Sequence, residues 1–373
     1  MFDRSIQVAV RRKTKVVIIG VLVALALAAC GSDDKTTSTT AGAAATAPTS
    51  ATADTFPVTI THKYGEAVIP EEPTKVISVG FNDQDAILAL GVKPIAIRDW
   101  YGDQPFATWP WAQAALGDAQ PTVLPADAIN FEQIAALAPD LIVGISSGMT
   151  QDDYDKLSKI APTIPQSADF VDYGVPWQVQ TETIAKALGR SAQGEQLVAD
   201  TEAKIAAAAA ANPQFTGKTS AVAFFYNDQP GAYSSDDMRS RLMTGLGFVI
   251  PADIDKAADG AFYASFSAEQ VGLLDVDALG VDRRRRRATA IVDSPLRLGL
   301  QAHTEGRELF VSGELAGAMS FSSPLSIPYT LEHLVPELVA AVDGDPATVV
   351  PSVAALDSAS STATTATATT TTG

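Results

Sequence analysis

The chain has 373 residues, 18% of them charged, and a formal net charge of −17 at pH 7. This length accommodates two domains, and so acidic a balance is a poor match for nucleic acid or another polyanionic partner. The three histidines, His62, His303 and His333, are too few to favour a metal site built from imidazoles, so we expect the protein to bind no metal directly.

The first 29 residues have the pattern of an export signal. Basic residues precede an apolar run at 16–29, which is short for a membrane span. The run ends in Leu27-Ala28-Ala29-Cys30-Gly31, which resembles the lipobox of bacterial lipoproteins, where the cysteine receives the lipid. We predict a signal peptide over 1–29, lipidation of Cys30 and a flexible Ser/Thr/Ala-rich tether over 30–55. An ordinary cleaved signal followed by a stray thiol is the alternative.

Strand and helix patterns alternate from residue 56 to residue 176, the predicted N-terminal α/β lobe. Residues 56–70 are predicted to form an edge segment. The elements expected after it are strands at 75–80, 93–97, 140–145 and 163–165, and helices at 84–90 and between the last two strands. Such alternation favours a largely parallel sheet whose faces are covered by helices.

One long helix is predicted at 191–211. Apolar residues recur at helical spacing in its first half, and the alanine run 206–211 keeps it helical without help from packing. Pro213 then ends it. Together with the residues before it, this helix forms a predicted connecting region over 177–212.

A second α/β lobe is predicted over 213–350, followed by a disordered Ser/Thr/Ala-rich tail over 351–373. The expected strands are 220–226, 277–281 and 308–312, and the expected helices are 237–245, 267–274, one near 294–301, and 328–342. The pattern is again that of a mainly parallel sheet.

The two halves resemble each other in sequence. Residues 130–144, NFEQIAALAPDLIVG, align without a gap with residues 267–281, SAEQVGLLDVDALGV. The alignment pairs Glu132 with Glu269 and Asp140 with Asp277. Earlier in each half, the tetrapeptide FNDQ matches YNDQ and a Leu-Gly pair recurs. Three matches in the same order indicate two related lobes, and chance similarity between α/β segments is the alternative.

Residues that follow the predicted strands are candidates for ligand contact, because ligands of such sheets lie beyond the carboxyl ends of the strands. Three of the four tryptophans crowd into the loop 98–117, which favours contact with a ligand's flat or apolar surface over local core packing. Arg98 is the best anchor for an anion, with a surface ion pair to Asp99 or Asp103 as the alternative. The candidate ligand residues are Phe81, Asn82, Arg98, Trp100, Tyr101, Trp109, Ser146, Ser147, Tyr226, Asn227, Arg239 and Tyr263.

Two other motifs leave alternatives open. Residues 144–148, GISSG, satisfy the G-x-S-x-G pattern of serine hydrolases, with His303 and His333 downstream as possible bases. A predicted helix start at Thr150 would leave Ser146 on a loop rather than on the tight turn that this nucleophile needs. A secreted serine hydrolase is therefore the alternative function. The arginine run 283–287 is either a solvated loop or a set of cations near the ligand.

The order of lipobox, tether, lobe, single long helix and related lobe resembles a substrate-binding lipoprotein of an ABC importer, in the class that binds iron-siderophores, haem or vitamin B12. The similarity covers residues 60–345, and its most specific stretches include 130–143 and FSSPLSIPYTLEHLVPEL at 321–338. It implies an α/β fold of two related lobes with mainly parallel sheets, joined by one long rigid helix. It also implies a non-enzymatic protein without a cofactor.

The resemblance further implies capture of a ferric siderophore in an interlobe cleft and its delivery to a permease, with iron held only through the ligand. Haem or a corrinoid is the alternative ligand, and Tyr101, Tyr226 or a histidine could then ligate haem iron. Glu132 and Glu269 match the glutamates that dock on permease arginines in this family. Carboxylates favoured by a helix dipole are the alternative for this pair. A monomer, lipid-anchored at the extracytoplasmic face of the cell membrane, is expected.

Overall fold

A computed structural model describes residues 54–226, 229–283 and 292–355. The predicted signal peptide, Cys30, nearly all of the tether and most of the predicted tail lie outside the described residues, as do Asn227 and the arginines after Arg283. Within the described ranges, no helix combines the length and apolar character needed to cross a membrane.

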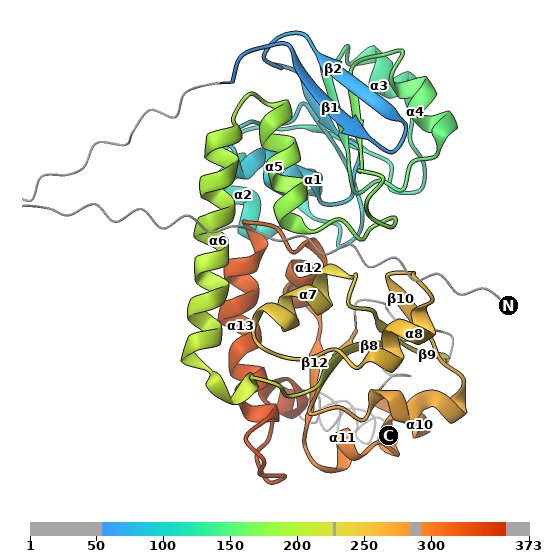
Figure 1. The fold of residues 1–373 in the computed structure, drawn as a ribbon, viewed down its shortest axis with the longest axis vertical. Coiled ribbons are helices and arrows are strands. Elements are labelled where there is room, and N and C mark those ends of the chain that lie inside the picture. The colour runs from blue at the N-terminus through green and yellow to red at the C-terminus, as the bar shows by residue number, and fades with distance from the viewer. Residues whose placement is uncertain (1–53, 227–228, 284–291, 356–373) are drawn as a thin grey trace, which may run out of the picture. The chain divides into compact units, whose positions relative to one another are not determined.

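The chain before the long helix, called the first lobe here, contains a hairpin and a five-stranded sheet (Figure 1). The antiparallel hairpin joins β1 (Val58–His62) to β2 (Gly65–Ile69) and takes the place of the predicted edge segment. The sheet has the order β5-β4-β3-β6-β7, and all its neighbours are parallel. Its strands are β3 (Val76–Ser78), β4 (Ala96–Arg98), β5 (Thr122–Leu124), β6 (Leu141–Gly144) and β7 (Thr163–Pro165).

Short helices connect these strands. They are α1 (Asp83–Ala89), the 3-10 turn η1 (Pro105–Ala107), α2 (Pro110–Leu116), α3 (Phe131–Ala136) and α4 (Gln151–Leu157). The prediction that 98–117 is an irregular loop is wrong, because η1 and α2 lie within it. Pro110 begins α2, where its missing N–H costs no helical hydrogen bond.

The helix α6 (Ser191–Ala211) coincides with the predicted long helix. It follows α5 (Trp177–Ala187), and the two helices pack closely at Gly194, where an added Cβ would lie 2.3 Å from the Cβ of Ala185. Figure 1 shows α6 running beside α5 in the first lobe and beside α13 in the second. The 3-10 turn η2 (Pro213–Phe215) follows it.

The chain after α6, called the second lobe here, forms another five-stranded sheet, in the order β10-β9-β8-β11-β12. Strands β8, β11 and β12 are parallel, whereas β9 and β10 add an antiparallel edge that the sequence did not predict. The strands are β8 (Ser220–Tyr226), β9 (Gln229–Tyr233), β10 (Tyr263–Ser265), β11 (Ala278–Asp282) and β12 (Glu308–Val311).

The helices that lie within the described part of the second lobe are α7 (Met238–Gly245), α8 (Ala252–Ala258), the 3-10 helix η3 (Ala268–Leu274), α10 (Pro295–Leu298), α11 (Gln301–Thr304), α12 (Gly313–Phe321) and α13 (Ser326–Ala341). The helix predicted near 294–301 is thus two short helices, and the helix predicted at 267–274 is of the 3-10 type. The fold class is confirmed: two α/β lobes with mainly parallel sheets are joined by one long helix.

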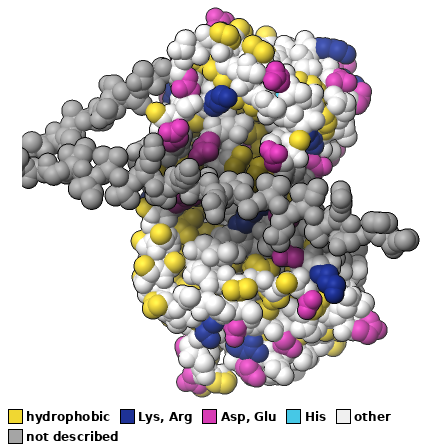
Figure 2. Space-filling model, in the orientation of Figure 1, with side chains coloured by type: hydrophobic (Ala, Val, Ile, Leu, Met, Phe, Trp, Pro, Cys, Tyr) yellow, Lys and Arg dark blue, Asp and Glu magenta, His cyan; other side chains and the backbone are white. Residues whose placement is uncertain are grey.

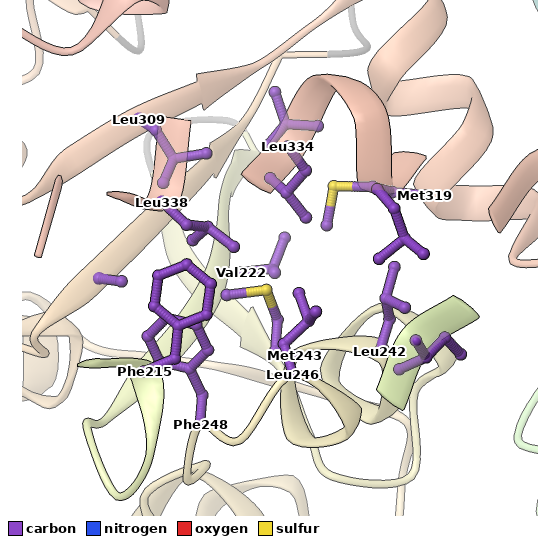
Figure 3. Close-up of a cluster of buried hydrophobic side chains, with 14 of the residues drawn as sticks. Phe215, Val222, Leu242, Met243, Leu246, Phe248, Leu309, Met319, Leu334 and Leu338 are labelled. Carbon is purple, nitrogen blue, oxygen red and sulfur yellow. The ribbon is translucent and has the colours of Figure 1, made fainter. Parts of the chain in front are cut away.

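Figure 3 shows the core under helices α7, α12 and α13, which cover one face of the second sheet. Leu334 and Leu338, one turn apart on α13, are fully buried there, and the rings of Phe215 and Phe248 stack 4.9 Å apart. Burying a leucine of this kind contributes about 2 kcal/mol. This packing fixes α12 and α13 on the second sheet.

Side chains on the face shown in Figure 2 agree with the acidic composition. Aspartates and glutamates are scattered over it, and its lysines and arginines do not gather into a large basic patch. This face therefore gives no support to a nucleic-acid partner.

Candidate ligand site

Rings gather at the carboxyl ends of the first sheet's strands. Phe81 follows β3 and Trp100 follows β4, and their rings stack with centroids 5.5 Å apart. Tyr101 meets the edge of Trp100 at 4.7 Å, and Tyr173 stacks with Phe81 at 6.2 Å. The structure thus brings together three of the predicted ligand residues, and all four rings are partly exposed.

The ring contacts continue into the second lobe at two places. Phe321 at the end of α12 lies 5.7 Å from Trp100, and Phe262 lies 5.7 Å from Tyr173. From Phe262 the contacts pass through Tyr263, which is 42% exposed, towards Tyr233. We call the following rings, each in contact with another of the set, the aromatic array: Phe81, Trp100, Tyr101, Trp109, Trp111, Tyr173, Phe224, Tyr233, Phe262, Tyr263 and Phe321.

Arg98 lies beneath this array rather than on the surface. Its guanidinium is 4.4 Å from the centre of the Phe81 ring and donates to the carbonyl oxygens of Val79 (3.4 Å) and Ala126 (2.9 Å). Asp99 accepts from the N–H of Trp100 at 2.8 Å, and no ion pair between Arg98 and Asp99 or Asp103 is found among the described residues. Burial lowers the pKa of Arg98, but a guanidinium stays charged. The cation therefore stands behind the Phe81 ring.

Arg239 has an equivalent arrangement in the second lobe. Its guanidinium lies 4.1 Å from the centre of the Tyr233 ring and pairs with Asp237 at 2.7 Å. The Tyr233 hydroxyl donates to a carboxylate oxygen of Asp282 at 3.3 Å, at the end of β11. Each lobe thus places an arginine behind one ring of the array, although only the second lobe pairs that arginine with a carboxylate through a described contact.

Trp109 and Trp111 lie at and inside the start of α2, and their indoles stack 5.0 Å apart at 9°. Trp109 is only 4% exposed. It packs so closely on α12 that a Cβ at Gly317 would lie 2.7 Å from it. Its ring therefore packs one lobe on the other, and a ligand contact through Trp109 stays a prediction.

Asn82 also joins the lobes. It is 2% exposed, its amide N–H donates to the carbonyl oxygen of Phe321 at 2.9 Å, and its oxygen accepts from Gln180 at 2.9 Å. The neighbouring Asp83 accepts from Gln180 at 2.5 Å and from the N–H of Ser146 at 3.2 Å. Burial raises the pKa of Asp83 to about 6, against those hydrogen bonds, which lower it. Nothing in the spacing of these residues predicts this buried network.

The described hydrogen bonds do not assemble a serine-hydrolase triad. Ser146 lies on a turn after β6, as predicted, and Thr150 begins α4 with a capping box completed by Asp153. Ser147 donates to the carbonyl oxygen of Gly144 at 2.7 Å. His303 faces Glu308 at 2.6 Å, and His333 stacks on Tyr329.

Glu132 and Glu269 occupy the same position in the two lobes. Each is exposed in the first turn of its helix, α3 or η3, and that turn is capped by Asn130 or Ser267. A shallow hollow of about 330 Å³ beside Glu132 is lined by residues 125 and 127–132. The geometry agrees with the pairing seen in the sequence.

Other predicted residues are placed in part or not at all. Tyr226 ends β8, where its backbone pairs with Gln229, but its side chain lies outside the description, as does Asn227. Among the residues that the structure places, no three of His, Cys, Asp or Glu gather as metal ligands would.

Sequence reasoning missed five members of the array: Tyr173, Phe224, Tyr233, Phe262 and Phe321. Tyr173 precedes a glycine in a loop, and Phe262 follows Gly260 in another, so the same argument that selected the tryptophan loop could have selected both. Phe321 is 221 residues from Trp100 in the chain, and no local pattern connects them.

Comparisons with known proteins agree with this geometry. A sequence model of the periplasmic binding protein family matches residues 77–307. A probable siderophore-binding lipoprotein of Bacillus subtilis (strain 168), YfiY, is 27% identical over 229 residues, which cover 59% of this chain and 67% of the relative.

Two solved structures have the same fold. A periplasmic solute binding protein of Mycobacterium smegmatis str. MC2 155 is 35% identical, with a TM-score of 0.68 over 76% of this chain and 98% of its own. PiaA of Streptococcus pneumoniae TIGR4, solved in complex with ferrichrome, is 25% identical, with a TM-score of 0.68 over 77% of this chain and 99% of its own.

Proposed function

The chain belongs to the periplasmic binding protein family, among the substrate-binding proteins of ABC importers, and we propose that it captures a ferric siderophore and delivers it to a permease. Proteins of this class bind solutes and are not enzymes. The observation that carries the proposal is the aromatic array, which runs through both lobes and has a guanidinium behind Phe81 and another behind Tyr233.

The chemistry of the array suits a large iron chelate. Partly exposed rings such as Phe81, Trp100 and Tyr173 offer apolar contact area with few rotatable bonds, so little entropy is lost when a ligand covers them. Iron stays coordinated by the siderophore in this proposal, and the protein supplies the walls of the site. The complex of PiaA with ferrichrome supports a chelate of this size as the first ligand to test.

Tryptophan fluorescence provides that test. The mature chain without its lipid is titrated with ferrichrome, a ferric carboxylate, a ferric catecholate and haemin. We expect saturable quenching by one class at micromolar or lower concentration. Trp100→Phe should remove most of the quenching, whereas Trp177→Phe should preserve it, because Trp177 is a buried residue of α5 outside the array. If none of the chelates quenches the wild type, the siderophore proposal is wrong.

Haem is the alternative ligand within the same class. The Tyr101 hydroxyl donates to the carbonyl oxygen of Ala316 at 3.4 Å, a long bond that an iron could replace. Haemin binding through Tyr101 would shift the Soret band, and Tyr101→Phe would abolish that shift. Saturable ferrichrome binding with no Soret shift would exclude it.

Delivery and anchoring complete the proposal. We infer that Glu132 and Glu269 dock on cationic residues of a permease, because two exposed carboxylates, one in each lobe, suit a partner with approximate two-fold symmetry. Replacing both with alanine should abolish uptake and leave ligand binding unchanged in vitro. Glu195→Ala, an exposed glutamate on α6, is the matched control. Weakened ligand binding in the double variant would contradict the docking role.

The lipid anchor is tested separately. We propose that Cys30 carries the lipid, because it is the chain's single cysteine and follows the apolar run directly. Cys30→Ala should release the protein from the membrane fraction and prevent labelling with radioactive palmitate. A Cys30→Ala protein that remains labelled would contradict this assignment.

A further inference from the structure

Asp85, in the first turn of α1, is a buried carboxylate that accepts hydrogen bonds from both lobes. It has an exposed fraction of 0%, and one of its oxygens, Oδ2, accepts two hydrogen bonds. The indole N–H of Trp111 donates from the first lobe at 2.8 Å, and the hydroxyl of Ser323 donates from the second lobe at 2.6 Å. The other oxygen, Oδ1, is buried and has no hydrogen-bond partner. A single oxygen atom therefore accepts one hydrogen bond from each lobe.

The Ser323 side of this contact is fixed by α13. The Ser323 oxygen accepts from the N–H of Ser326 at 3.0 Å, and the N–H of Ser323 donates to the Ser326 hydroxyl at 2.8 Å. This reciprocal pair closes the turn that leads into α13, with the hydrogen-bond pattern of a capping box. The hydroxyl hydrogen of Ser323 is then directed to Asp85. Since α13 packs in the core of the second lobe, the contact is attached to a rigid element.

The Trp111 side of the contact supports the aromatic array. Trp111 stacks on Trp109 at 5.0 Å and lies 5.5 Å from Phe321. Asn82, three residues before Asp85, holds the carbonyl of Phe321 at 2.9 Å. The first turn of α1 thus holds residues 321–323 of the second lobe at two points, one through an amide and one through a carboxylate.

We propose that Asp85 is a positioning residue, whose carboxylate fastens the start of α13 to α1 and α2 and so fixes the aromatic array across the lobes. The effect on the array concerns ligand binding and rests on the proposed function, whereas the fastening of the lobes does not. We call Asp85, Trp111 and Ser323 the Asp85 junction.

The junction works through an acceptor oxygen and not through an ion pair, because both of its donors are neutral. Asparagine has the same shape and presents an oxygen at the same place, so Asp85→Asn should keep both hydrogen bonds. Asp85→Ala removes the acceptor and leaves the N–H of Trp111 and the hydroxyl of Ser323 without it inside the interface. The two substitutions therefore separate the role of the oxygen from that of the charge.

Hydrogen exchange measured by mass spectrometry on the full mature chain tests the fastening without any ligand. Asp85→Ala should speed exchange of the amides of 323–331 at least tenfold, although the substitution is in the other lobe. Ser323→Ala should do the same to residues 110–116. Asp85→Asn should not speed exchange of either segment by more than threefold. Asp140→Ala is the matched control, since Asp140 binds the Thr74 hydroxyl within the first lobe at 2.8 Å, and it should leave 323–331 unchanged.

Two outcomes would overturn the proposal. The first is an Asp85→Ala protein that folds and shows unchanged exchange at 323–331. If that variant does not fold, unchanged exchange at 110–116 in Ser323→Ala has the same meaning. The other is an Asp85→Asn protein as damaged as Asp85→Ala. Ferrichrome titrations of the same proteins test the effect on the aromatic array. We expect Asp85→Ala to bind ferrichrome tenfold more weakly than the wild type, and Asp85→Asn to bind it as the wild type does. If the wild type binds neither ferrichrome nor any other of the chelates, the ligand proposal fails, and the exchange data still decide the junction.

Discussion

The two lobes share one tie and differ in how they bury charge. In the first lobe, Asp140 before β6 accepts from the N–H and hydroxyl of Thr74 and from the N–H of Lys75, each at 2.8 Å. In the second lobe, Asp277 before β11 accepts from the N–H (2.7 Å) and hydroxyl (2.8 Å) of Thr219. The same side chain thus fastens the same pair of strands in both lobes, which supports the relation that the sequence alignment predicted.

The first helices after the central strands differ. Helix α1 buries Asp83 and Asp85 against neutral donors, whereas α7 is capped by Asp237, which is paired with Arg239 at 2.7 Å. A buried carboxylate that has only neutral donors destabilises the fold when it is charged. A buried carboxylate paired with a guanidinium becomes strongly destabilising only when the guanidinium is removed. The two lobes should therefore respond oppositely to substitutions at these helices.

The sheet edges differ as well. In the first lobe β4 follows α1 and pairs in parallel with β3. In the second lobe, Val249 follows α7 and makes one parallel bridge to Thr219, just before β8. The antiparallel strands β9 and β10 extend the edge of that sheet. The strands that carry the shared Asp–Thr tie are the constant part of the fold, and the edges are the variable part.

The largest effect is expected in the second lobe. Arg239→Met should destabilise the protein by about 3–5 kcal/mol, because it leaves Asp237, 2% exposed, without its cation. Asp237→Ser in the same chain should recover most of that loss, since serine still caps α7 and carries no charge. Urea unfolding measures both, and a loss below about 1 kcal/mol in the single variant would show that the buried pair is not what distinguishes the lobes.

The next effect concerns pH and the first lobe. Burial raises the pKa of Asp85 to about 6 from an ordinary value of 3.8, although Ser323 and Trp111 act to lower it. A carboxyl with a higher pKa in the folded state stabilises the fold fully below pH 3.8, and this contribution is lost as the pH rises through about 6. Asp85→Asn should therefore gain stability relative to the wild type between pH 4 and pH 7, by about 3 kcal/mol. A stability difference that does not depend on pH would contradict this.

The fold was predictable wherever the information is local. The long helix was correct at both ends, because its alanines and Pro213 act through the backbone alone. The alignment of 130–144 with 267–281 identified Asp140 and Asp277 as equivalent, and in the structure each accepts from a threonine, Thr74 or Thr219. Of the site, the strand-end rule located Phe81, Trp100 and Tyr101 together.

The match of FNDQ with YNDQ was misleading. Asp83 begins α1 in the first copy, whereas Gln229 begins β9 in the second. Pro230 and Gly231 resemble a turn, but Gly231 allows the carbonyl oxygen of Ala264 to approach to 2.5 Å of where a Cβ would be. The Asp85 junction could not be predicted from local patterns either, since Asp85 and Ser323 are 238 positions apart in the chain.

The shared tie should give equal, moderate effects. Asp140→Ala and Asp277→Ala each remove a carboxylate that holds a threonine N–H and hydroxyl, at a cost of about 1–2 kcal/mol. Although burial opposes it, hydrogen bonds from Thr74 and Lys75 lower the pKa of Asp140, and those from Thr219 lower that of Asp277. Both contributions are therefore lost as the pH falls below about 4, opposite to Asp85. Unfolding curves that differ by more than about 1 kcal/mol between the two variants would break the equivalence of the lobes.

The smallest effect is expected at the paired glutamates. Glu132→Ala and Glu269→Ala should each change the free energy of unfolding by less than about 0.5 kcal/mol, because both side chains are exposed. A stabilising role through the helix dipole predicts a loss of about 0.3–1 kcal/mol that disappears in high salt. Unfolding in low and high salt distinguishes the two. A salt-sensitive loss of stability at both positions, with uptake intact, would mean that the pair only stabilises the starts of its helices. Unchanged stability with uptake lost would mean that Glu132 and Glu269 repeat a docking surface, one copy in each lobe.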